Sequence, residues 1–210
     1  IKENPDNYQA HFYYGVLNKL QKNSNKAVEE LSIALKLNPI YEEAAIELGF
    51  VFIERKEPDA AIKVLTTFSQ TSKNPKIYFY LGKAFYDKSD FSTAVKWFQK
   101  TIEIDVESAE TFALLGDALL RMNDFEGAKK ILSDAAKNSK NPIVISKLGT
   151  VLFQIGQQLY IDEKKILNEI DSLKENKKKL SKEDETKVIE LQTEADKIKL
   201  NKENMLTASK

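Results

Sequence analysis

Few residues in this sequence are of types that could do chemistry. His11 is the only histidine, and its place in an apolar helical stripe favours a structural role, which leaves a catalytic triad without a base. Cysteine is absent, so thiolate nucleophiles, thiolate metal ligands and disulfides are excluded. Paired carboxylates occur at 29–30 and 42–43, but acidic side chains on helix surfaces are ordinarily solvated. We therefore expect no enzyme activity, no metal and no cofactor.

The formal net charge is zero, because 32 Lys and Arg residues balance 32 Asp and Glu residues. This balance gives no long-range attraction to nucleic acid or to an anionic membrane surface. No window reaches the roughly 18 apolar residues of a membrane span, and no secretion signal opens the chain. The first residue is Ile1, so we expect a fragment of a longer protein. The compartment, cytoplasmic or periplasmic, stays open.

Small residues recur along the chain with a fixed period. Five glycines are spaced by 34, 33, 34 and 33 residues: Gly15, Gly49, Gly82, Gly116 and Gly149. Four alanines keep the same period twelve residues later: Ala27, Ala61, Ala94 and Ala128. One glycine per period does not form the cluster that a phosphate-binding loop needs. Self-similarity at this period is typical of helical repeat proteins.

The apolar pattern predicts two helices in each repeat. Side chains such as Tyr14 and Leu17 recur at helical spacing, which favours helices over strands. The first helix of each repeat, helix A, is expected at about 8–21, 42–55, 75–88, 109–122 and 142–155, and a helix B follows in the first four. Residues that can cap helix N-termini are Ser24, Asp90, Ser108, Asp124 and Asn141.

The small residues are expected to allow close packing of the two helices in each repeat. A glycine at the eighth position and an alanine at the twentieth let helices A and B of one repeat approach closely, where larger side chains would hold them apart. Each helix pair has two apolar faces and cannot bury both alone, so neighbouring pairs must stack. The sequence therefore predicts a superhelix with a concave inner face.

These features resemble the tetratricopeptide repeat (TPR) family, which has a 34-residue period. A leucine or tyrosine precedes each repeat glycine, at Tyr14, Leu48, Leu81, Leu115 and Leu148. The pair Asn38-Pro39 closes a repeat, as in this family. The resemblance covers residues 8 to 156 and implies an all-α fold, a right-handed α-solenoid of stacked helix-turn-helix repeats.

The expected domain organisation follows the repeats. Residues 1–7 are interpreted as the tail of a preceding repeat, because residues 1–5 align with residues 35–39 at an offset of 34. Four repeats then occupy 8–41, 42–74, 75–108 and 109–141. Residues 142–210 form either a fifth, extended repeat or a helix followed by a coiled-coil-like helical hairpin.

The C-terminal segment has neither glycine nor proline after Gly156, so long helices are expected. Two coiled-coil-like stripes occur, Leu159, Ile166, Ile170, Leu173 and Leu180, then Val188, Leu191, Ala195, Ile198 and Met205. A reversal near Leu180-Ser181, with Ser181 and Asp184 as a capping box, predicts an antiparallel hairpin whose tip carries the solvated run 177–179.

An alternative makes this hairpin a long insertion in the fifth repeat. Residues from about 192 to 210 would then be its displaced helix B, with Ala208 as the small residue. This arrangement resembles repeat proteins of the Bacteroidota, whose late repeats carry lysine- and glutamate-rich extensions.

The TPR resemblance implies that helix-A positions two, five, nine, twelve and thirteen line the concave groove. The predicted peptide-binding residues are Phe12, Val16, Ile46, Phe50, Ile53, Phe79, Lys83 and Tyr86. An exposed apolar surface of this extent usually marks an interaction site, so a hydrophobic peptide or helix is the expected ligand. Alternatively, an upstream helix or tighter superhelical packing fills the trough.

One known variant of the family grips the C-terminal carboxylate of chaperones with a defined set of lysine, asparagine and arginine residues. The corresponding residues here are Phe12, Val16, Glu47, Lys76 and Tyr80. Only Lys76 matches, which disfavours this mode of binding.

Three functions remain. The leading hypothesis is a protein–protein interaction scaffold or adaptor that binds a protein or peptide partner of unknown identity in the groove. The second is self-assembly, in which end repeats or the hairpin pair with another copy. The third is a substrate-recruiting arm of a larger enzyme. Fold resemblance alone cannot choose the partner.

Overall fold

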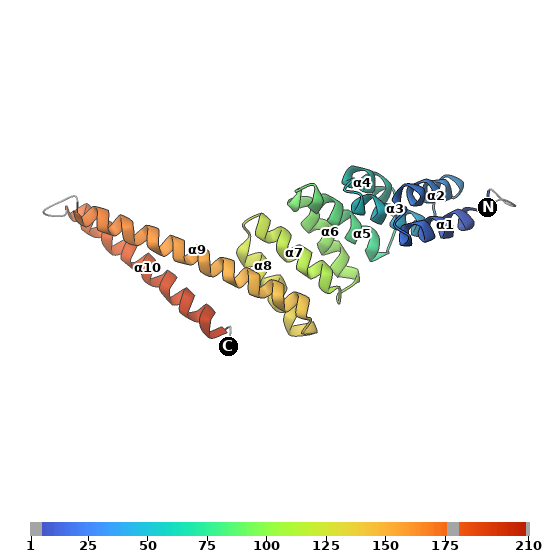
Figure 1. Cartoon of the computed structure of the whole chain (residues 1–210). Coiled ribbons are helices and arrows are strands. Elements are labelled where there is room, and N and C mark those ends of the chain that lie inside the picture. The colour runs from blue at the N-terminus through green and yellow to red at the C-terminus, as the bar shows by residue number, and fades with distance from the viewer. Residues whose placement is uncertain (1–5, 176–180, 209–210) are drawn as a thin grey trace. The chain divides into compact units, whose positions relative to one another are not determined.

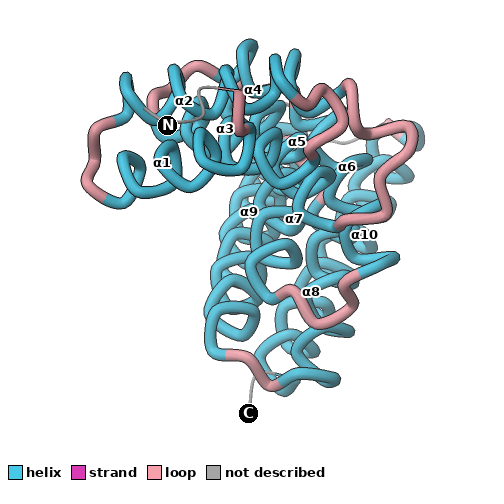
Figure 2. The backbone as a smooth tube through the Cα atoms, turned by 90° about the vertical axis from the view of Figure 1, so that its right-hand side faces the viewer, coloured by secondary structure: helices cyan, strands magenta, loops and turns pink. Residues whose placement is uncertain are grey.

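The computed structural model describes residues 6–175 and 181–208, and all regular elements in these ranges are α-helices (Figures 1 and 2). The elements fall into two compact units, divided after Lys147. No helix in these ranges is both long enough and apolar enough to cross a membrane. Most of the predicted tail, residues 1–5, lies outside the described residues.

The first unit contains four helix pairs and the start of α9. The helices are α1 (Tyr8–Leu20), α2 (Ser24–Leu37), α3 (Glu42–Glu54), α4 (Pro58–Thr66), α5 (Pro75–Asp87), α6 (Phe91–Ile104), α7 (Ala109–Arg121) and α8 (Phe125–Ser139). The A helices are α1, α3, α5 and α7, and the B helices are α2, α4, α6 and α8. Short loops join them in chain order (Figure 2). The predicted all-helical repeat fold is confirmed.

The second unit is built from two long helices, α9 (Pro142–Glu175) and α10 (Lys182–Ala208). The helix predicted to end near residue 155 instead continues without interruption to residue 175, because the sequence offers no glycine or proline that would end it after Gly156. Residues 192–208 likewise continue α10 and are not a separate helix. Whether this pair is an insertion in a fifth repeat stays a prediction.

Within the second unit, α10 runs back along α9 as an antiparallel hairpin (Figure 1). The Nζ atom of Lys202 lies 2.5 Å from a carboxylate oxygen of Glu163, and that of Lys187 lies 2.8 Å from one of Glu169. The backbone N–H of Asp184 donates to Ser181 at 3.2 Å and the Ser181 N–H donates back at 3.2 Å, which is the predicted capping box. The predicted tip 177–179, Leu180 and the side chain of Ala208 lie outside the described residues.

Polar side chains begin several helices as predicted. Asp90, Ser108, Asp124 and Asn141 each accept a hydrogen bond from a backbone N–H two or three residues later. These bonds satisfy donors that have no partner inside the helix. The cap predicted at Ser24 is wrong, because Ser24 is the first residue of α2 and the preceding residue occupies the N-cap position.

The turn from helix A to helix B has the same backbone conformation in all four repeats. Lys22, Lys56, Ser89 and Asn123 have left-handed φ values of 61° or 62°. The N–H of the following residue donates to the carbonyl five residues earlier, at 2.8 to 3.0 Å in the four turns. This Schellman-type ending satisfies carbonyls at the end of helix A and reverses the chain tightly enough to lay helix B against it.

The repeat glycines lie where helix A meets helix B. A Cβ atom added at Gly15, Gly49, Gly82 or Gly116 would lie 2.6 to 2.8 Å from side-chain atoms of a leucine or phenylalanine of helix B. The alanines Ala27, Ala61, Ala94 and Ala128 are fully buried. Gly149 is different, because no described neighbouring atom lies within 4 Å of such a Cβ. The packing role expected for Gly149 therefore does not hold.

The substitution Gly82→Ala is expected to destabilise the protein by about 1–3 kcal/mol, because the new methyl group would press on the fully buried ring of Phe98. Gly149→Ala is the matched control, and it is expected to be neutral or to stabilise by up to about 1 kcal/mol through helix propensity. Urea unfolding followed by circular dichroism measures both. Equal effects of the two substitutions would contradict this account of the glycines.

Candidate functional site

The A helices form the inner layer of the first unit. Successive A helices among α1, α3, α5 and α7 approach one another to within 8 Å between Cα atoms, whereas the described B helices α2, α4, α6 and α8 do not. In a curved stack of repeats, the more closely spaced layer lies on the inside. Side chains that join successive A helices therefore mark the concave face.

Two of the eight predicted groove residues are part of the core. Ile46 and Ile53 are only 6% and 2% exposed, and they pack with Tyr78 and Leu81 of the next repeat. Their positions, the fifth and twelfth of α3, are directed between the repeats and not into an open groove. The prediction that these two side chains bind a ligand is therefore wrong.

Phe12 and Val16 of α1 are half-buried. They pack against the cluster that contains Leu48 and Val51 of α3, and the Phe12 ring lies 5.0 Å from that of Tyr41. Both side chains thus hold the first two repeats together while part of each faces solvent.

Phe50, Phe79 and Tyr80 form a continuous aromatic strip across α3 and α5. The ring centroids of Phe50 and Tyr80 are 5.8 Å apart, and those of Phe79 and Tyr80 are 5.3 Å apart. All three side chains are half-buried, so each packs on the protein and leaves part of its ring accessible. Phe79 also packs towards Phe98 of α6, in the core cluster of the third repeat.

Tyr80 occupies position six of its A helix, a position that the groove prediction did not include. Burial raises the pKa of its phenol, and the nearby carboxylates of Glu47, Glu110 and Glu54 raise that pKa further. No described residue forms a hydrogen bond with the Tyr80 hydroxyl.

In three of the four steps between successive A helices, the residue at position six contacts the previous A helix. Glu47 of α3 accepts a hydrogen bond from Lys19 of α1, whose Nζ also lies 5.1 Å from the Phe50 ring centroid. Tyr80 of α5 contacts Phe50 of α3. Lys147 of α9 donates to Asp117 of α7 at 2.6 Å. We call this series of contacts the position-six ladder.

The last step of the ladder is a polar network around Asp117. The carboxylate accepts hydrogen bonds from Lys147, from the Tyr86 hydroxyl and, at 3.4 Å, from Arg121. Burial alone would raise the pKa of Asp117, but the donors Lys147 and Tyr86 outweigh it and hold that pKa below its usual value. Burial and the bond to Asp117 raise the pKa of Tyr86. Tyr86, predicted as a ligand-binding residue, thus already has a partner within the protein.

Lys83, the last predicted groove residue, lies at position nine of α5 and is half-buried. It shares a helix face with Phe79, Tyr80 and Tyr86, which are three or four residues away. No described residue forms an ion pair or hydrogen bond with it.

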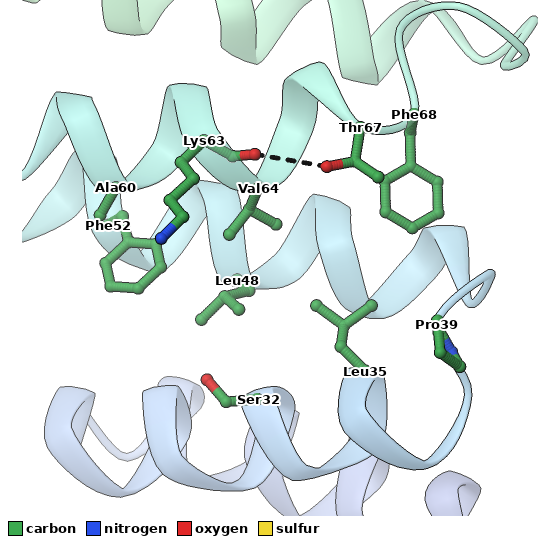
Figure 3. Close-up of a pocket in the computed structure, with 10 residues that line it drawn as sticks. All are labelled: Ser32, Leu35, Pro39, Leu48, Phe52, Ala60, Lys63, Val64, Thr67 and Phe68. Atoms are coloured by element: carbon green, nitrogen blue, oxygen red, sulfur yellow. Dashed lines mark hydrogen bonds between the residues drawn. The ribbon is translucent and has the colours of Figure 1, made fainter.

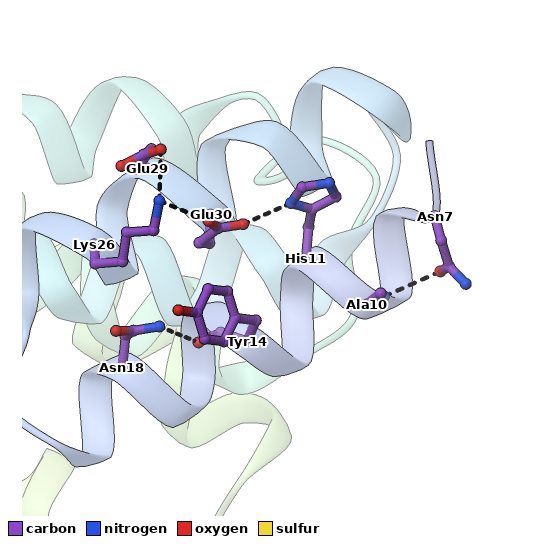
Figure 4. Close-up of polar contacts among 8 residues, drawn as sticks. All are labelled: Asn7, Ala10, His11, Tyr14, Asn18, Lys26, Glu29 and Glu30. Carbon is purple, nitrogen blue, oxygen red and sulfur yellow. Dashed lines mark hydrogen bonds and ion pairs between the residues drawn. The ribbon is translucent and has the colours of Figure 1, made fainter. Parts of the chain in front are cut away.

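His11 is buried at the contact between α1 and α2 (Figure 4). A hydrogen bond of 2.6 Å joins its Nδ1 atom to Glu30, which also pairs with Lys26 at 3.0 Å. Burial opposes ionisation of Glu30, but the hydrogen bonds from His11 and Lys26 hold its pKa below the usual value. The single histidine is thus part of a buried hydrogen-bonded contact within the first repeat.

A pocket of about 530 Å³ opens between α2, α3 and α4 (Figure 3). Its walls are mainly apolar, with Leu35, Leu48, Phe52 and Phe68 among them. Successive B helices in the described part of the chain do not approach one another to within 8 Å between Cα atoms, which agrees with a pocket on this side of the repeats. Its only ionisable lining residue is Lys63, so it lacks the convergent polar groups of a small-molecule site.

Comparison with known proteins identifies the fold. Residues 109–142 match the tetratricopeptide repeat family model. The crystal structure of a MamA protein is similar with a TM-score of 0.63 and 18% identity, over 69% of this chain and 80% of that one. A thermophilic TPR protein of Thermus thermophilus has a TM-score of 0.57 and 16% identity, over 92% of this chain and 99% of that one. YrrB, described as a TPR protein with an unusual peptide-binding site, has a TM-score of 0.62 and 15% identity, over 100% of this chain and 95% of that one.

This chain therefore contains a tetratricopeptide repeat at 109–142 and has the fold of a TPR protein. The resemblance inferred from the periodic glycines and alanines is confirmed. No curated protein matches the sequence.

The lowered pKa values of Asp117 and Glu30 predict a loss of stability in acid. A carboxylate with a lowered pKa in the folded state stabilises the protein above its unfolded-state pKa of about 4, and this contribution is lost as the pH falls through the folded-state pKa. Asp117→Asn is expected to lower the thermal midpoint near neutral pH and to flatten its decline between about pH 5 and pH 2.

Asp87→Asn is the control for this experiment, because Asp87 is exposed and no described residue forms an ion pair with it. Circular dichroism melts over a pH series measure the effect. An Asp117→Asn variant whose thermal midpoint has the wild-type pH dependence would show that the Asp117 network does not contribute to stability.

Proposed function

We propose that this protein is an interaction scaffold that binds an apolar segment of another protein against the concave face of its A helices. The binding surface is the aromatic strip of Phe50, Phe79 and Tyr80, extended onto α1. The segment would pack its apolar side chains on these rings, as amphipathic helices and extended peptides do in apolar grooves.

The observation that carries the proposal is the accessible apolar surface of the inner layer. Tyr13 and Leu20, at positions six and thirteen of α1, are 67% and 71% exposed. They belong to the same inner layer of A helices as the aromatic strip of α3 and α5, where half-buried rings leave one side open. Large apolar side chains grouped on one face usually mark an interaction site, and fixed aromatic rings provide contact area at little entropic cost.

The comparisons support an interaction role of this general kind. YrrB, which shares the fold, is described as having a peptide-binding site. The matching family and the similar structures indicate no enzyme family. The chemistry of the groove agrees, because its ionisable groups are mostly engaged in contacts between repeats.

A selection from a displayed library of random short peptides tests the proposal. We expect peptides rich in apolar residues, and we expect the double variant Tyr13→Ser, Tyr80→Ser to bind the best of them at least about tenfold more weakly. Fluorescence anisotropy with a labelled peptide measures this loss. Tyr13 is exposed and Tyr80 is half-buried, so circular dichroism must show that the double variant keeps the helical content of the wild type.

Ile104→Ser is the matched control, since Ile104 is an exposed apolar residue on the B helix α6. It should bind the same peptide with wild-type affinity. Equal binding by all three proteins would exclude the inner layer as the binding surface.

Self-association is a second candidate, favoured by one feature of α9. Phe153, Tyr160 and Leu167 are exposed and follow one another at seven-residue intervals. This spacing places them in one line along the helix, as at helix–helix contacts in coiled coils. Another copy of the hairpin would bury this line.

Sedimentation velocity over a range of concentrations tests the second candidate. If the line mediates pairing, the wild type should shift towards a dimer at high concentration, and the double variant Phe153→Ser, Leu167→Ser should stay monomeric. A wild type that remains monomeric throughout rejects self-association.

A further inference from the structure

The charged side chains in the middle of the A helices are few and mostly paired. Positions five to twelve of the five predicted A helices hold only Lys19, Glu47, Lys83, Asp117 and Lys147. Lys19 pairs with Glu47, and Lys147 pairs with Asp117. Lys83 alone has no ion-pair or hydrogen-bond partner among the described residues. Within the described part of the chain, the middle of the inner layer therefore carries one uncompensated, half-buried cation.

The position-six ladder explains why Lys83 lacks a partner. In two other steps, the residue at position nine contacts position six of the next repeat, as Phe50 contacts Tyr80 and Asp117 contacts Lys147. The corresponding residue for Lys83 is Leu114, which is apolar and packs against the core cluster of Phe98. An acidic residue at that position would have completed the pair. The ladder is thus incomplete at this step.

Because Lys83 lacks an acidic partner in the groove, it favours a ligand that brings a carboxylate. A partly buried cation is weakly solvated and gains most from a carboxylate that displaces its remaining water. Lys83 lies one helical turn from Phe79 and Tyr80, so an apolar group on the aromatic strip would bring a neighbouring carboxylate towards it. The carboxylates of Glu54 and Glu110 lie near Tyr80, so the surrounding groove is not positively charged as a whole. A carboxylate of the ligand would therefore be attracted to Lys83 and not to the groove in general.

We propose that Lys83 binds the side-chain carboxylate of an aspartate or glutamate in the bound segment, next to an apolar residue that packs on the aromatic strip. This inference rests on the proposed function, because it adds a negative charge to the segment that is proposed to bind on the aromatic strip. Lys83 is not among the residues aligned above with the clamp for C-terminal carboxylates, and the carboxylate assigned to it is a side chain within the segment.

Parallel selections test the assignment. Random short peptides are selected on the wild type, on Lys83→Glu and on Lys96→Glu, a control on the exposed face of α6. The wild type and the Lys96→Glu control should both enrich an acidic residue beside an apolar one. Lys83→Glu should lose this preference and enrich lysine or arginine there instead.

A double-mutant cycle with the best wild-type peptide follows. Replacing its acidic residue with the corresponding amide should weaken binding to the wild type about tenfold and should have little effect on Lys83→Met, which keeps the aliphatic stem. Circular dichroism checks that each variant is folded. Amidation of the peptide C-terminus should change nothing.

The outcomes separate the two proposals. Peptides that depend on Tyr13 and Tyr80 but show no acidic preference would overturn the role of Lys83 and leave the proposed function standing. A loss of binding only on C-terminal amidation would also overturn it. If no peptide binds the wild type, the proposed function fails and this inference fails with it.

Discussion

The close approach of helix A to helix B is the constraint on which the rest of the structure depends. The glycines of the first four repeats leave no room for a Cβ atom against the leucine or phenylalanine of helix B, so that side chain packs directly on the backbone of helix A. Left-handed residues at the turns bring the chain back for this packing. Helix pairs of one shape then stack with their A helices closer together than their B helices. The concave face follows from packing repeated four times.

The inner layer uses its side chains in two ways. Residues such as Ile46 and Ile53 fill the space between repeats, and the pairs Lys19–Glu47 and Asp117–Lys147 join them by charge. These contacts fix the spacing of the A helices and leave those groups unavailable to a ligand. The aromatic strip keeps one side of each ring open, and Lys83 is the one charge in this series without a described partner. The proposed binding function is thus assigned to the side chains that are not fully used in contacts between repeats.

The fold could be predicted because its constraints are local. The spacing of the glycines located every A helix of the first unit to within one residue. The groove residues were predicted less well. The family's list of groove positions does not say how deeply each side chain is buried, and Ile46 and Ile53 proved to be buried. The position-six ladder could not be predicted, because its contacts depend on how one A helix is displaced along the next. The sequence of a single repeat does not give this displacement. The continuity of α9 was missed although the absence of any helix breaker after Gly156 indicated it.

The central claim is that recognition takes place on the inner face of the A helices. Hydrogen–deuterium exchange with and without a selected peptide tests it most directly, because it reports protection along the whole chain. The account predicts added protection in α1, α3 and α5 and none in the outer B helices. Protection confined to the B helices or to the hairpin of α9 and α10 would contradict it.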